Sequence, residues 1–281
     1  MKFVKMHAVG NDYAYFDFEK VKNYDLSLLS KIVSDRRFGI GSDGLIAVEK
    51  LRENKFKMIM YNADGSRGAT CGNGVRCSAY FAKKYLGATG NEIKVKTDAF
   101  DTTVFLSEKM GKIFAKADMG VIKRVSNSQK ITNALQKVGL YVDYRQVFEI
   151  NAGNKHLVFF YPNHSLVSLA KGVNKSRLYL DGVNIERVYK IERTNLSVRI
   201  FAEIFERGTG KTLSCGSGAC AIYKAFREFS VLSPQKAEII TDGGTLFTEI
   251  VGEKTYLQSE ICEVFKGELN EDLILGAKNE V

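Results

Sequence analysis

The chain has 281 residues, of which 45% are hydrophobic and 26% are charged, and these fractions are typical of a folded globular protein. They exclude a disordered, collagen-like or coiled-coil chain, and the length favours one large domain or two of ordinary size. The net charge of +9 is scattered in pairs such as Arg36-Arg37 and Lys83-Lys84, so no basic block indicates a nucleic-acid surface.

The N-terminal segment lacks the features of a targeting signal. Lys5, Asp12 and Asp17 interrupt it where a signal peptide needs apolar residues, and no apolar run reaches the roughly 18 residues of a membrane span. Five cysteines form an odd set in a chain of this size, which favours reduced thiols over a disulfide framework. We therefore expect a cytoplasmic protein that binds neither a membrane nor nucleic acid.

Apolar periodicity predicts strands and helices in alternation. Alternating runs rich in β-branched and aromatic residues indicate strands, and apolar residues three and four apart indicate helices. In chain order the expected elements are a helix over 26–37, a strand over 56–62, a helix after residue 71, strands over 92–97, 102–106 and 112–117, a helix over 128–139, strands over 156–161 and 196–205, a helix after residue 215 and a strand over 237–241. This mixture predicts an α+β protein.

The chain contains an internal repeat. The segments 60–77 and 204–220 superpose on Cys71 and Cys215 with an offset of 215 − 71 = 144, about half the chain. Two shorter matches keep this offset within one residue, namely KTDAF at 96–100 with ITDGG at 240–244, and Gly10-Asn11 with Gly153-Asn154. Matches in one order at a nearly constant offset argue for a duplicated fold.

The duplication predicts two pseudo-symmetric lobes with the active site between them. We expect the first lobe to comprise residues 1–117 plus 267–281 and to carry Cys71. The second lobe would comprise residues 118–266 and carry Cys215.

Three apparent cofactor motifs fail in their context. GIGSDG at 39–44 follows an expected helix, where a dinucleotide site needs a strand. GTGKT at 208–212 is not a phosphate loop, because Phe205 stands where that motif requires glycine. The cysteine pairs lie almost two helical turns apart, so they would point in different directions and suit no zinc ion. We expect neither a metal nor a cofactor.

Cys71 and Cys215 each stand before Gly-x-Gly at the expected start of a helix. Their sulfur atoms should therefore lie beside backbone N–H groups and the positive end of a helix dipole, which stabilises a thiolate. The same N–H groups form a cradle for an anion such as a carboxylate. The alternative is that both cysteines only pack, as we expect of the other three. These three, expected to be buried apolar residues, are Cys77, Cys220 and Cys262.

Two facing thiols would suit stereoinversion. If the lobes face each other, a thiolate would remove an α-proton from one side and the opposite thiol would deliver a proton to the other side. The cradles would stabilise the carboxylate as negative charge develops. This chemistry needs no cofactor.

Six motifs match one known family in the correct order. They are MHAVGND at 6–12, RRFGIGSDGL at 36–45, YNADGSRGATCGNGVRC at 61–77, GNKH at 153–156, VNIERV at 183–188 and FERGTGKTLSCGSGAC at 205–220. On these motifs the chain resembles diaminopimelate epimerase along essentially its whole length. The resemblance implies a curled mixed β-sheet around a central helix in each lobe. It also implies a homodimeric, cofactor-independent isomerase that interconverts LL- and meso-diaminopimelate for lysine and peptidoglycan synthesis.

The resemblance implies roles for individual residues. Cys71 and Cys215 match the two catalytic cysteines, and His156 and Glu206 match the polar partners that tune them. The residues that match the grip on the non-reacting end of the substrate are Asn11, Asn62, Asn154, Asn184, Glu206 and Arg207. Those that match the backbone donors to the reacting carboxylate are Gly72, Asn73, Gly216 and Ser217. An Arg fork with amide donors suits a carboxylate, and Glu suits an ammonium.

Three positions depart from residues common in the family, namely Lys155, Lys211 and Ser214. Lys155 stands where proline is usual and adds charge near the site. A racemase of another amino acid on the same scaffold, such as histidine or a thioether-linked diamino diacid, therefore stays open. A nucleotide- or nucleic-acid-binding module is the remaining alternative.

Overall fold

The computed structural model describes residues 1–69, 71–125, 128–193, 197–230 and 234–278, which divide between two compact units. The first unit comprises Met1–Ala117 and Ser259–Val281, and the second comprises Asp118–Gln258. The chain thus returns to the first unit within β17 (Lys254–Glu268), earlier than the predicted residue 267.

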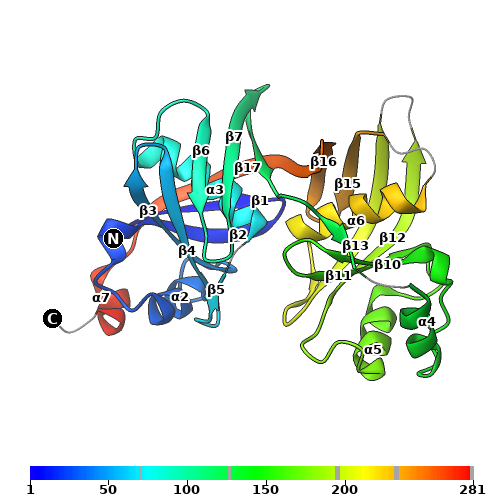
Figure 1. The fold of residues 1–281 in the computed structure, drawn as a ribbon. Helices are drawn as coiled ribbons and strands as arrows, with labels where there is room; N and C mark the ends of the chain where they lie inside the picture. The colour runs from blue at the N-terminus through cyan, green and yellow to red at the C-terminus, as the bar shows by residue number, and fades with distance from the viewer. Residues whose placement is uncertain (70, 126–127, 194–196, 231–233, 279–281) are drawn as a thin grey trace. The chain divides into compact units, whose positions relative to one another are not determined.

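The first unit is a ring of strands around a helix (Figure 1). Its strands besides β17 are β1 (Lys2–Ala8), β2 (Asn11–Asp17), β3 (Gly44–Arg52), β4 (Lys55–Asn62), β5 (Arg67–Gly68), β6 (Glu92–Lys96), β7 (Asp101–Lys109) and β8 (Lys112–Asp118). Its helical segments are α1 (Phe18–Val21), α2 (Leu26–Ser34), α3 (Gly72–Tyr85), α7 (Glu271–Ile274) and the 3-10 turn η2 (Leu275–Ala277). Hydrogen-bonded neighbours run β17-β1-β2-β3-β4-β6-β7-β8 and return to β17, and α3 contacts β1, β2, β3, β4, β6 and β7.

The second unit repeats this plan. Its strands besides β17 are β9 (Lys123–Arg124), β10 (Val147–Asn151), β11 (Lys155–Phe160), β12 (Asn184–Arg193), β13 (Val198–Glu206), β14 (Gly210–Thr212), β15 (Lys236–Thr241) and β16 (Gly244–Val251). Its helical segments are α4 (Ser128–Gln136), the 3-10 turn η1 (Tyr144–Gln146), α5 (Leu166–Ser176) and α6 (Gly216–Phe229). Neighbours run β9-β10-β11-β12-β13-β15-β16-β17, and α6 contacts β9, β10, β11, β12, β15 and β16.

The pairing directions confirm the predicted duplication. From β1 to β7 they run antiparallel, parallel, antiparallel, parallel and antiparallel. From β10 to β16 they run in the same order. Both α3 and α6 have 14 residues and begin directly after a cysteine. The prediction of an α+β protein with two pseudo-symmetric lobes, each a mixed sheet around a central helix, is therefore confirmed.

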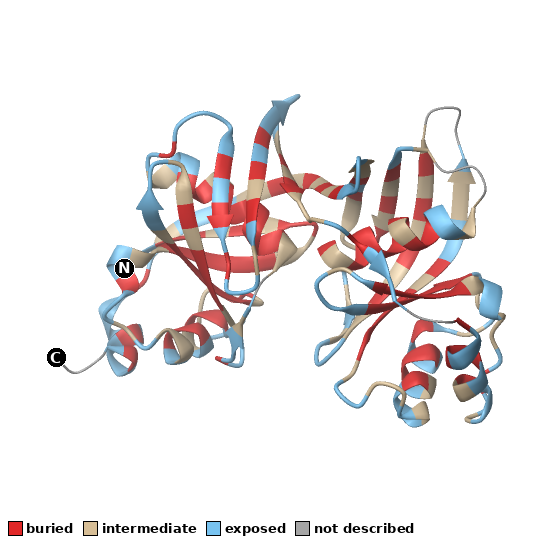
Figure 2. Ribbon diagram, in the orientation of Figure 1, coloured by how far each residue is buried: buried red, intermediate tan, exposed pale blue. Residues whose placement is uncertain are grey.

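Helices on both faces of each sheet explain why its strands are buried. In the first unit Leu29 and Val33 of α2 pack against Phe16 and Leu45 on the outer face. In the second unit α4 and α5 cover the corresponding strands with Leu135 and Leu169, among others. Figure 2 shows the resulting bands of buried residues along the strands of both units. Each fully buried side chain of this size contributes about 1.5–3 kcal/mol of transfer free energy.

The predicted elements are present, with shifted ends. Leu196, the first residue of the strand expected over 196–205, lies outside the described residues, and β13 begins at Val198. The GIGSDG segment connects the end of α2 to the start of β3, which is the reverse of the strand-to-helix order of a dinucleotide site.

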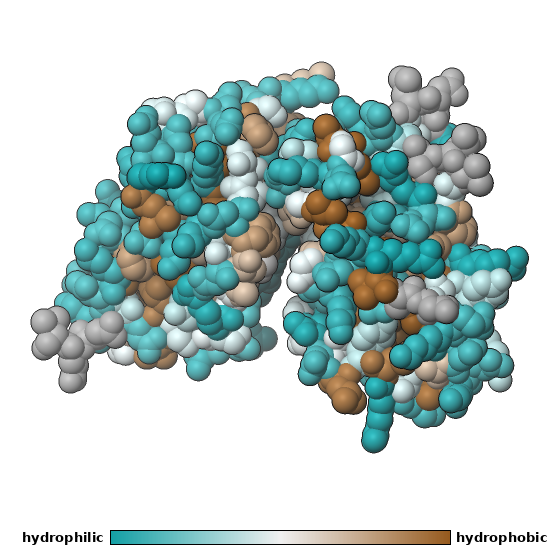
Figure 3. Space-filling model, in the orientation of Figure 1, coloured by the Kyte–Doolittle hydropathy of each residue, from teal (hydrophilic) through white to brown (hydrophobic). Residues whose placement is uncertain are grey.

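The surface in Figure 3 is mainly hydrophilic, with apolar side chains in separate patches. Within the described ranges, no helix has both the length and the apolar character needed to cross a bilayer.

Candidate active site

Cys71 caps the N-terminus of α3. Its backbone is extended (φ −146°, ψ 118°), and its sulfur accepts the N–H of Gly74 at 3.4 Å. The first N–H groups of a helix have no partner within the helix, so Gly72 and Asn73 present donors at the same end. Asn11, at the start of β2, places its Oδ1 3.2 Å from the Cys71 sulfur. We call Asn11, Cys71, Gly72, Asn73 and Gly74 the Cys71 cluster.

Asp43 fixes the side chain of Asn11. It accepts from Asn11 Nδ2 at 2.9 Å and from the backbone N–H of Asp12 at 3.2 Å. Arg36 bridges the two acidic residues, with its Nη2 2.9 Å from Asp43 and 3.0 Å from Asp12. Although burial raises the pKa of Asp12, hydrogen bonds from Lys5 and Arg36 outweigh it and lower that pKa below its usual value. The acceptor beside Cys71 is therefore held by a network of charged groups.

The other predicted side chains of the first unit are also held in place. Asn73 is buried, and its Oδ1 accepts from Nη2 of the fully buried Arg76 at 2.5 Å. Asn62 ends β4, and its Nδ2 donates to Ser66 at 2.9 Å. Asn73 thus stands at the first turn of α3, beside Cys71, with its side chain turned to Arg76.

Cys215 caps α6 in the same backbone conformation as Cys71 (φ −136°, ψ 124°), and its sulfur accepts the N–H of Gly218 at 3.4 Å. Ser217 Oγ lies 3.3 Å from the sulfur. Burial raises the pKa of the Cys215 thiol well above its usual value, and the charges of Glu206 and Glu186 raise it further, against hydrogen bonds from Ser217 and Gly218. The two thiols therefore share a backbone setting but differ in their polar neighbours.

His156 forms a buried pair with Glu186 on the adjacent parallel strand. Its Nδ1 lies 2.6 Å from Glu186 Oε1, and both side chains are fully buried. Its Nε2 lies 2.8 Å from Asn154 Oδ1, so both ring nitrogens have partners. We call His156, Glu186, Glu206, Cys215 and Ser217 the Cys215 cluster.

Glu206 ends β13, and Arg207 follows it. Burial raises the pKa of the Glu206 carboxyl, and Thr212 donates to its Oε1 at 2.8 Å. The Arg207 N–H donates to Asn184 Oδ1 at 2.8 Å, and its guanidinium donates to the carbonyl of Asp181 at 3.1 Å. Asn184 is buried, whereas the side chain of Arg207 is exposed.

Comparisons with known proteins show the family of this chain. The sequence model of the diaminopimelate epimerase family matches residues 3–125 and 148–264. A diaminopimelate epimerase of Acetivibrio thermocellus is 34% identical in an alignment 281 residues long, and this alignment covers 96% of this chain and 99% of that protein. The chain belongs to the diaminopimelate epimerase family. This membership confirms the prediction of an isomerase.

Solved structures share the fold of this family member. A predicted epimerase from Pseudomonas aeruginosa has a TM-score of 0.70 at 8% identity, with 95% of this chain and 98% of that chain covered. A PhzF-family phenazine biosynthesis protein from Bacillus anthracis has a TM-score of 0.67 at 12% identity, with coverages of 96% and 99%. At these identities the likeness establishes the fold alone.

The departures from the family pattern have local partners. The ammonium of Lys155 lies 6.0 Å above the ring of Tyr179. Lys211 pairs with Glu203 at 3.2 Å and Asp242 at 3.1 Å. Ser214 is buried next to Cys215. The added charge of Lys211 is thus balanced by two carboxylates of its own unit.

All five cysteines are described, and all are free thiols. Cys77 and Cys220 are buried as predicted, whereas Cys262 is only half-buried, so that prediction was wrong. Cys262 of β17 lies opposite His7 of β1 in the strand register. Side chains along a strand alternate between the two faces of the sheet, so not every residue of β17 faces the core. In the described part of the chain, no three His, Cys, Asp or Glu side chains gather as a metal site requires.

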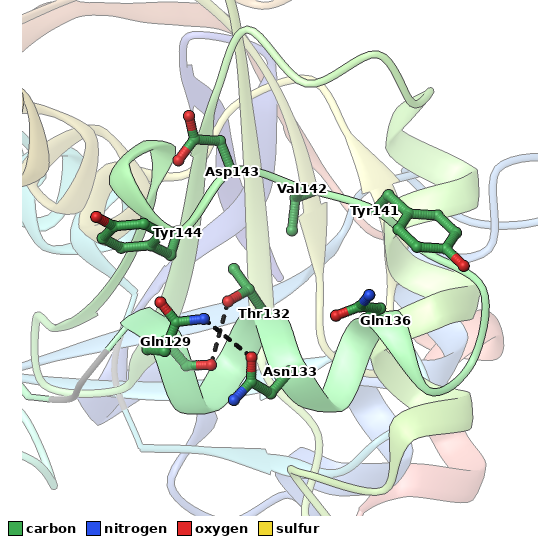
Figure 4. Close-up of a pocket in the computed structure, with 8 residues that line it drawn as sticks. All are labelled: Gln129, Thr132, Asn133, Gln136, Tyr141, Val142, Asp143 and Tyr144. Atoms are coloured by element: carbon green, nitrogen blue, oxygen red, sulfur yellow. Dashed lines mark hydrogen bonds between the residues drawn. The ribbon is translucent and has the colours of Figure 1, made fainter.

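A groove of about 390 Å³ lies beside α4, outside both cysteine clusters (Figure 4). Its polar lining is engaged locally, since Gln129 donates to Asn133 at 2.9 Å and Thr132 donates to the Gln129 carbonyl at 3.1 Å. Asp143, also in the lining, pairs with Arg145. These polar side chains of the groove therefore have partners within the same unit.

Sequence reasoning missed two carboxylates: Asp43, which contacts Asn11 of the Cys71 cluster, and Glu186 of the Cys215 cluster. Both carboxylates lie inside motifs that were matched to the family, but neither spacing nor residue type distinguishes them from surface acids. The available signal was the position of Glu186 between Ile185 and Val188 in β12, because a carboxylate that is buried among apolar residues needs a partner.

Proposed function

We propose that this chain interconverts LL- and meso-diaminopimelate by moving the α-proton between two cysteines. The observation that supports this most strongly is the equivalence of Cys71 and Cys215, each of which caps a 14-residue helix and accepts an N–H at 3.4 Å. Inversion needs a base on one side of the α-carbon and an acid on the other. The proposal therefore requires both sulfur atoms to reach one substrate carbon.

The proton transfers balance without a cofactor. One cysteine thiolate takes the α-proton and becomes a thiol, while the C–H electron pair delocalises into the carboxylate. The other cysteine thiol gives its proton to the opposite face and becomes the thiolate. The N–H groups of Gly72 and Asn73 in one unit, and of Gly216 and Ser217 in the other, are the donors proposed for that carboxylate.

The distal end of the substrate would be recognised in the second unit. Arg207 and the amide of Asn184 supply donors for a carboxylate, and Glu206 supplies acceptors for an ammonium. Asn154 would add an amide next to His156, which it already contacts at 2.8 Å. Asn11 and Asn62 complete the proposed set from the first unit. A monofunctional amino acid would leave several of these polar groups unpaired, at about 1–3 kcal/mol each.

The setting of this activity follows from the same proposal. A bifunctional diamino diacid is a small soluble substrate, and its epimerisation would serve lysine and peptidoglycan precursor synthesis in the cytoplasm. The homodimer implied by the family resemblance stays a prediction.

Exchange of the α-proton in D2O tests the substrate. LL-diaminopimelate, histidine and a thioether-linked diamino diacid would each be followed by NMR without an added cofactor. We expect deuterium incorporation with inversion for diaminopimelate. Exchange with histidine or the thioether analogue, but not with diaminopimelate, would support the two-cysteine chemistry and contradict the proposed substrate. Stabilisation by nucleotides or DNA, with no exchange of any amino acid, would favour a binding module.

A further inference from the structure

Glu186 is a buried carboxylate. No role was predicted for it from the sequence, and the proposed reaction does not use it. It lies in β12, directly after Ile185, and its side chain is fully buried. One oxygen, Oε1, lies 2.6 Å from Nδ1 of His156. The other, Oε2, is buried and has no hydrogen-bond partner among the described residues. Such an arrangement is unusual, because buried carboxylate oxygens normally accept hydrogen bonds.

The carboxylate lies against the first turn of α6. A Cβ built on Gly218 would be 2.8 Å from Glu186 Oε1 and 3.5 Å from the Cys215 sulfur. The oxygen and the sulfur therefore both border the space that this glycine leaves open. The N-terminal end of α6 favours a negative charge here.

The charged neighbours of Cys215 are few. Glu206 of β13, Glu186 of β12 and His156 of β11 belong to its cluster. On other elements packed against α6, Arg124 of β9 pairs with Glu228 and Glu249 of β16 lies near Tyr223, both towards the C-terminal end of the helix. Local negative charge therefore dominates around the sulfur.

We propose that Glu186 is a positioning residue for Cys215: it holds the His156 ring in place and its charge keeps the neighbouring thiol protonated. This inference rests on the proposed function for its meaning, because a protonated Cys215 is the proton donor in one direction of the interconversion. The His156 ring is held by Glu186 on one side and by Asn154 on the other. The two thiols are thus made unequal by side chains, although their backbones are alike.

The pH dependence of alkylation of Cys215 tests the proposal. Iodoacetamide reacts with the thiolate, so the rate at Cys215, read by peptide mass spectrometry, reports its protonation. Glu186→Gln keeps the size of the side chain and removes its charge. We expect Cys215 to react roughly tenfold faster at about pH 8 in this variant, with its midpoint moved to lower pH.

Glu203→Gln is the matched control. Glu203 lies on the adjacent strand β13, where it pairs with Arg187 and Lys211, and it belongs to neither cluster. We expect wild-type alkylation in this variant. A folded Glu186→Gln protein whose Cys215 midpoint equals that of the wild type would overturn the proposal, as would a rate raised by the same factor at every pH, which indicates altered access alone.

A second variant covers the case in which Glu186→Gln fails to fold. Glu186→Asp retracts the carboxylate by one methylene, and we expect a smaller movement of the midpoint in the same direction; an unchanged midpoint would overturn the proposal. Exchange of diaminopimelate by the wild type is measured separately. Loss of the proposed function would show there, and failure of the Glu186 inference would show only in the alkylation profile.

Discussion

The sulfur of Cys71 lies 3.2 Å from the side-chain oxygen of Asn11. The amide of Asn11 cannot rotate freely, because its nitrogen donates to Asp43 at 2.9 Å. At Cys215 the polar side chain beside the sulfur is instead the hydroxyl of Ser217 at 3.3 Å, which can donate as well as accept. The duplicated backbone thus places two thiols equivalently, and the side chains around them make the two sites different.

Asp43→Ala should reduce turnover without unfolding the chain. Loss of the carboxylate frees the Asn11 amide, so the acceptor beside Cys71 is no longer fixed. We expect kcat to fall roughly tenfold, in line with the cost of misplaced groups in active sites. Asp101→Ala, which removes an exposed carboxylate paired with Lys55 in the same unit, is the control and should retain activity. Equal kcat values for the two variants would contradict the role of Asp43.

Gly218→Ala should impair the Cys215 cluster. The added Cβ would lie 2.8 Å from Glu186 Oε1, so the carboxylate must move away from the start of α6. We expect a marked loss of kcat with a folded protein, measured by steady-state kinetics and circular dichroism. Gly276→Ala meets no atom within 4 Å and should behave as the wild type. Full activity of Gly218→Ala would show that the cluster tolerates displacement of Glu186.

Alkaline pH should destabilise the fold partly through buried thiols. Burial raises the pKa of Cys215 above its ordinary value of 9.0 and that of Cys77 to about 12. Above pH 9.0 the unfolded chain releases these protons while the folded chain keeps them, so the free energy of unfolding falls as pH rises. Between about pH 8 and pH 10.5, the Tm of Cys215→Ser and the Tm of Cys77→Ser should each fall by less than the Tm of the wild type.

Ser107→Ala provides the reference for that measurement, because it changes an exposed strand residue that does not ionise. Its Tm should fall with pH as the wild-type Tm does. If all four proteins lose the same Tm over this range, the buried thiols contribute nothing to the pH dependence.

Arg207→Ala should weaken substrate binding more than turnover. Its guanidinium is exposed and contacts the carbonyl of Asp181, so its removal leaves the core intact. Loss of a charge-assisted hydrogen bond of about 1.5–3 kcal/mol corresponds to a rise in KM of roughly 10- to 100-fold. Arg145→Ala, at an exposed pair with Asp143, is the matched control. A KM unchanged from the control would remove Arg207 from the proposed binding set.

Local sequence signals were sufficient to predict the starts of the two central helices. Cys71 and Cys215 cap α3 and α6 because Gly-x-Gly follows each of them and the apolar period changes there. The end of α2 could not be predicted from periodicity. Asp35 accepts from the N–H groups of Arg37 and Phe38, each at 2.7 Å, and this local turn stops the helix at Ser34 rather than at residue 37.

Contacts between strands that are distant in the sequence could not be predicted from sequence patterns. β1 pairs with β17 at the other end of the sequence, and His156 pairs with Glu186 through a parallel register of β11 and β12. The roles of Asp43 and Glu186 depend on such contacts, because each acts on a cysteine through an intervening side chain or through charge. Motif matching finds residues that a family shares, whereas these partners follow from the fold.

The most direct test of the two-cysteine account is deuterium exchange by single cysteine variants. Cys71→Ser and Cys215→Ser would be incubated with LL- and with meso-diaminopimelate in D2O, with Cys262→Ser as a control outside both clusters. The account predicts that inversion is abolished in both variants and retained in the control. Inversion at the wild-type rate in either Cys71→Ser or Cys215→Ser would contradict it, because one cysteine would then suffice for both proton transfers.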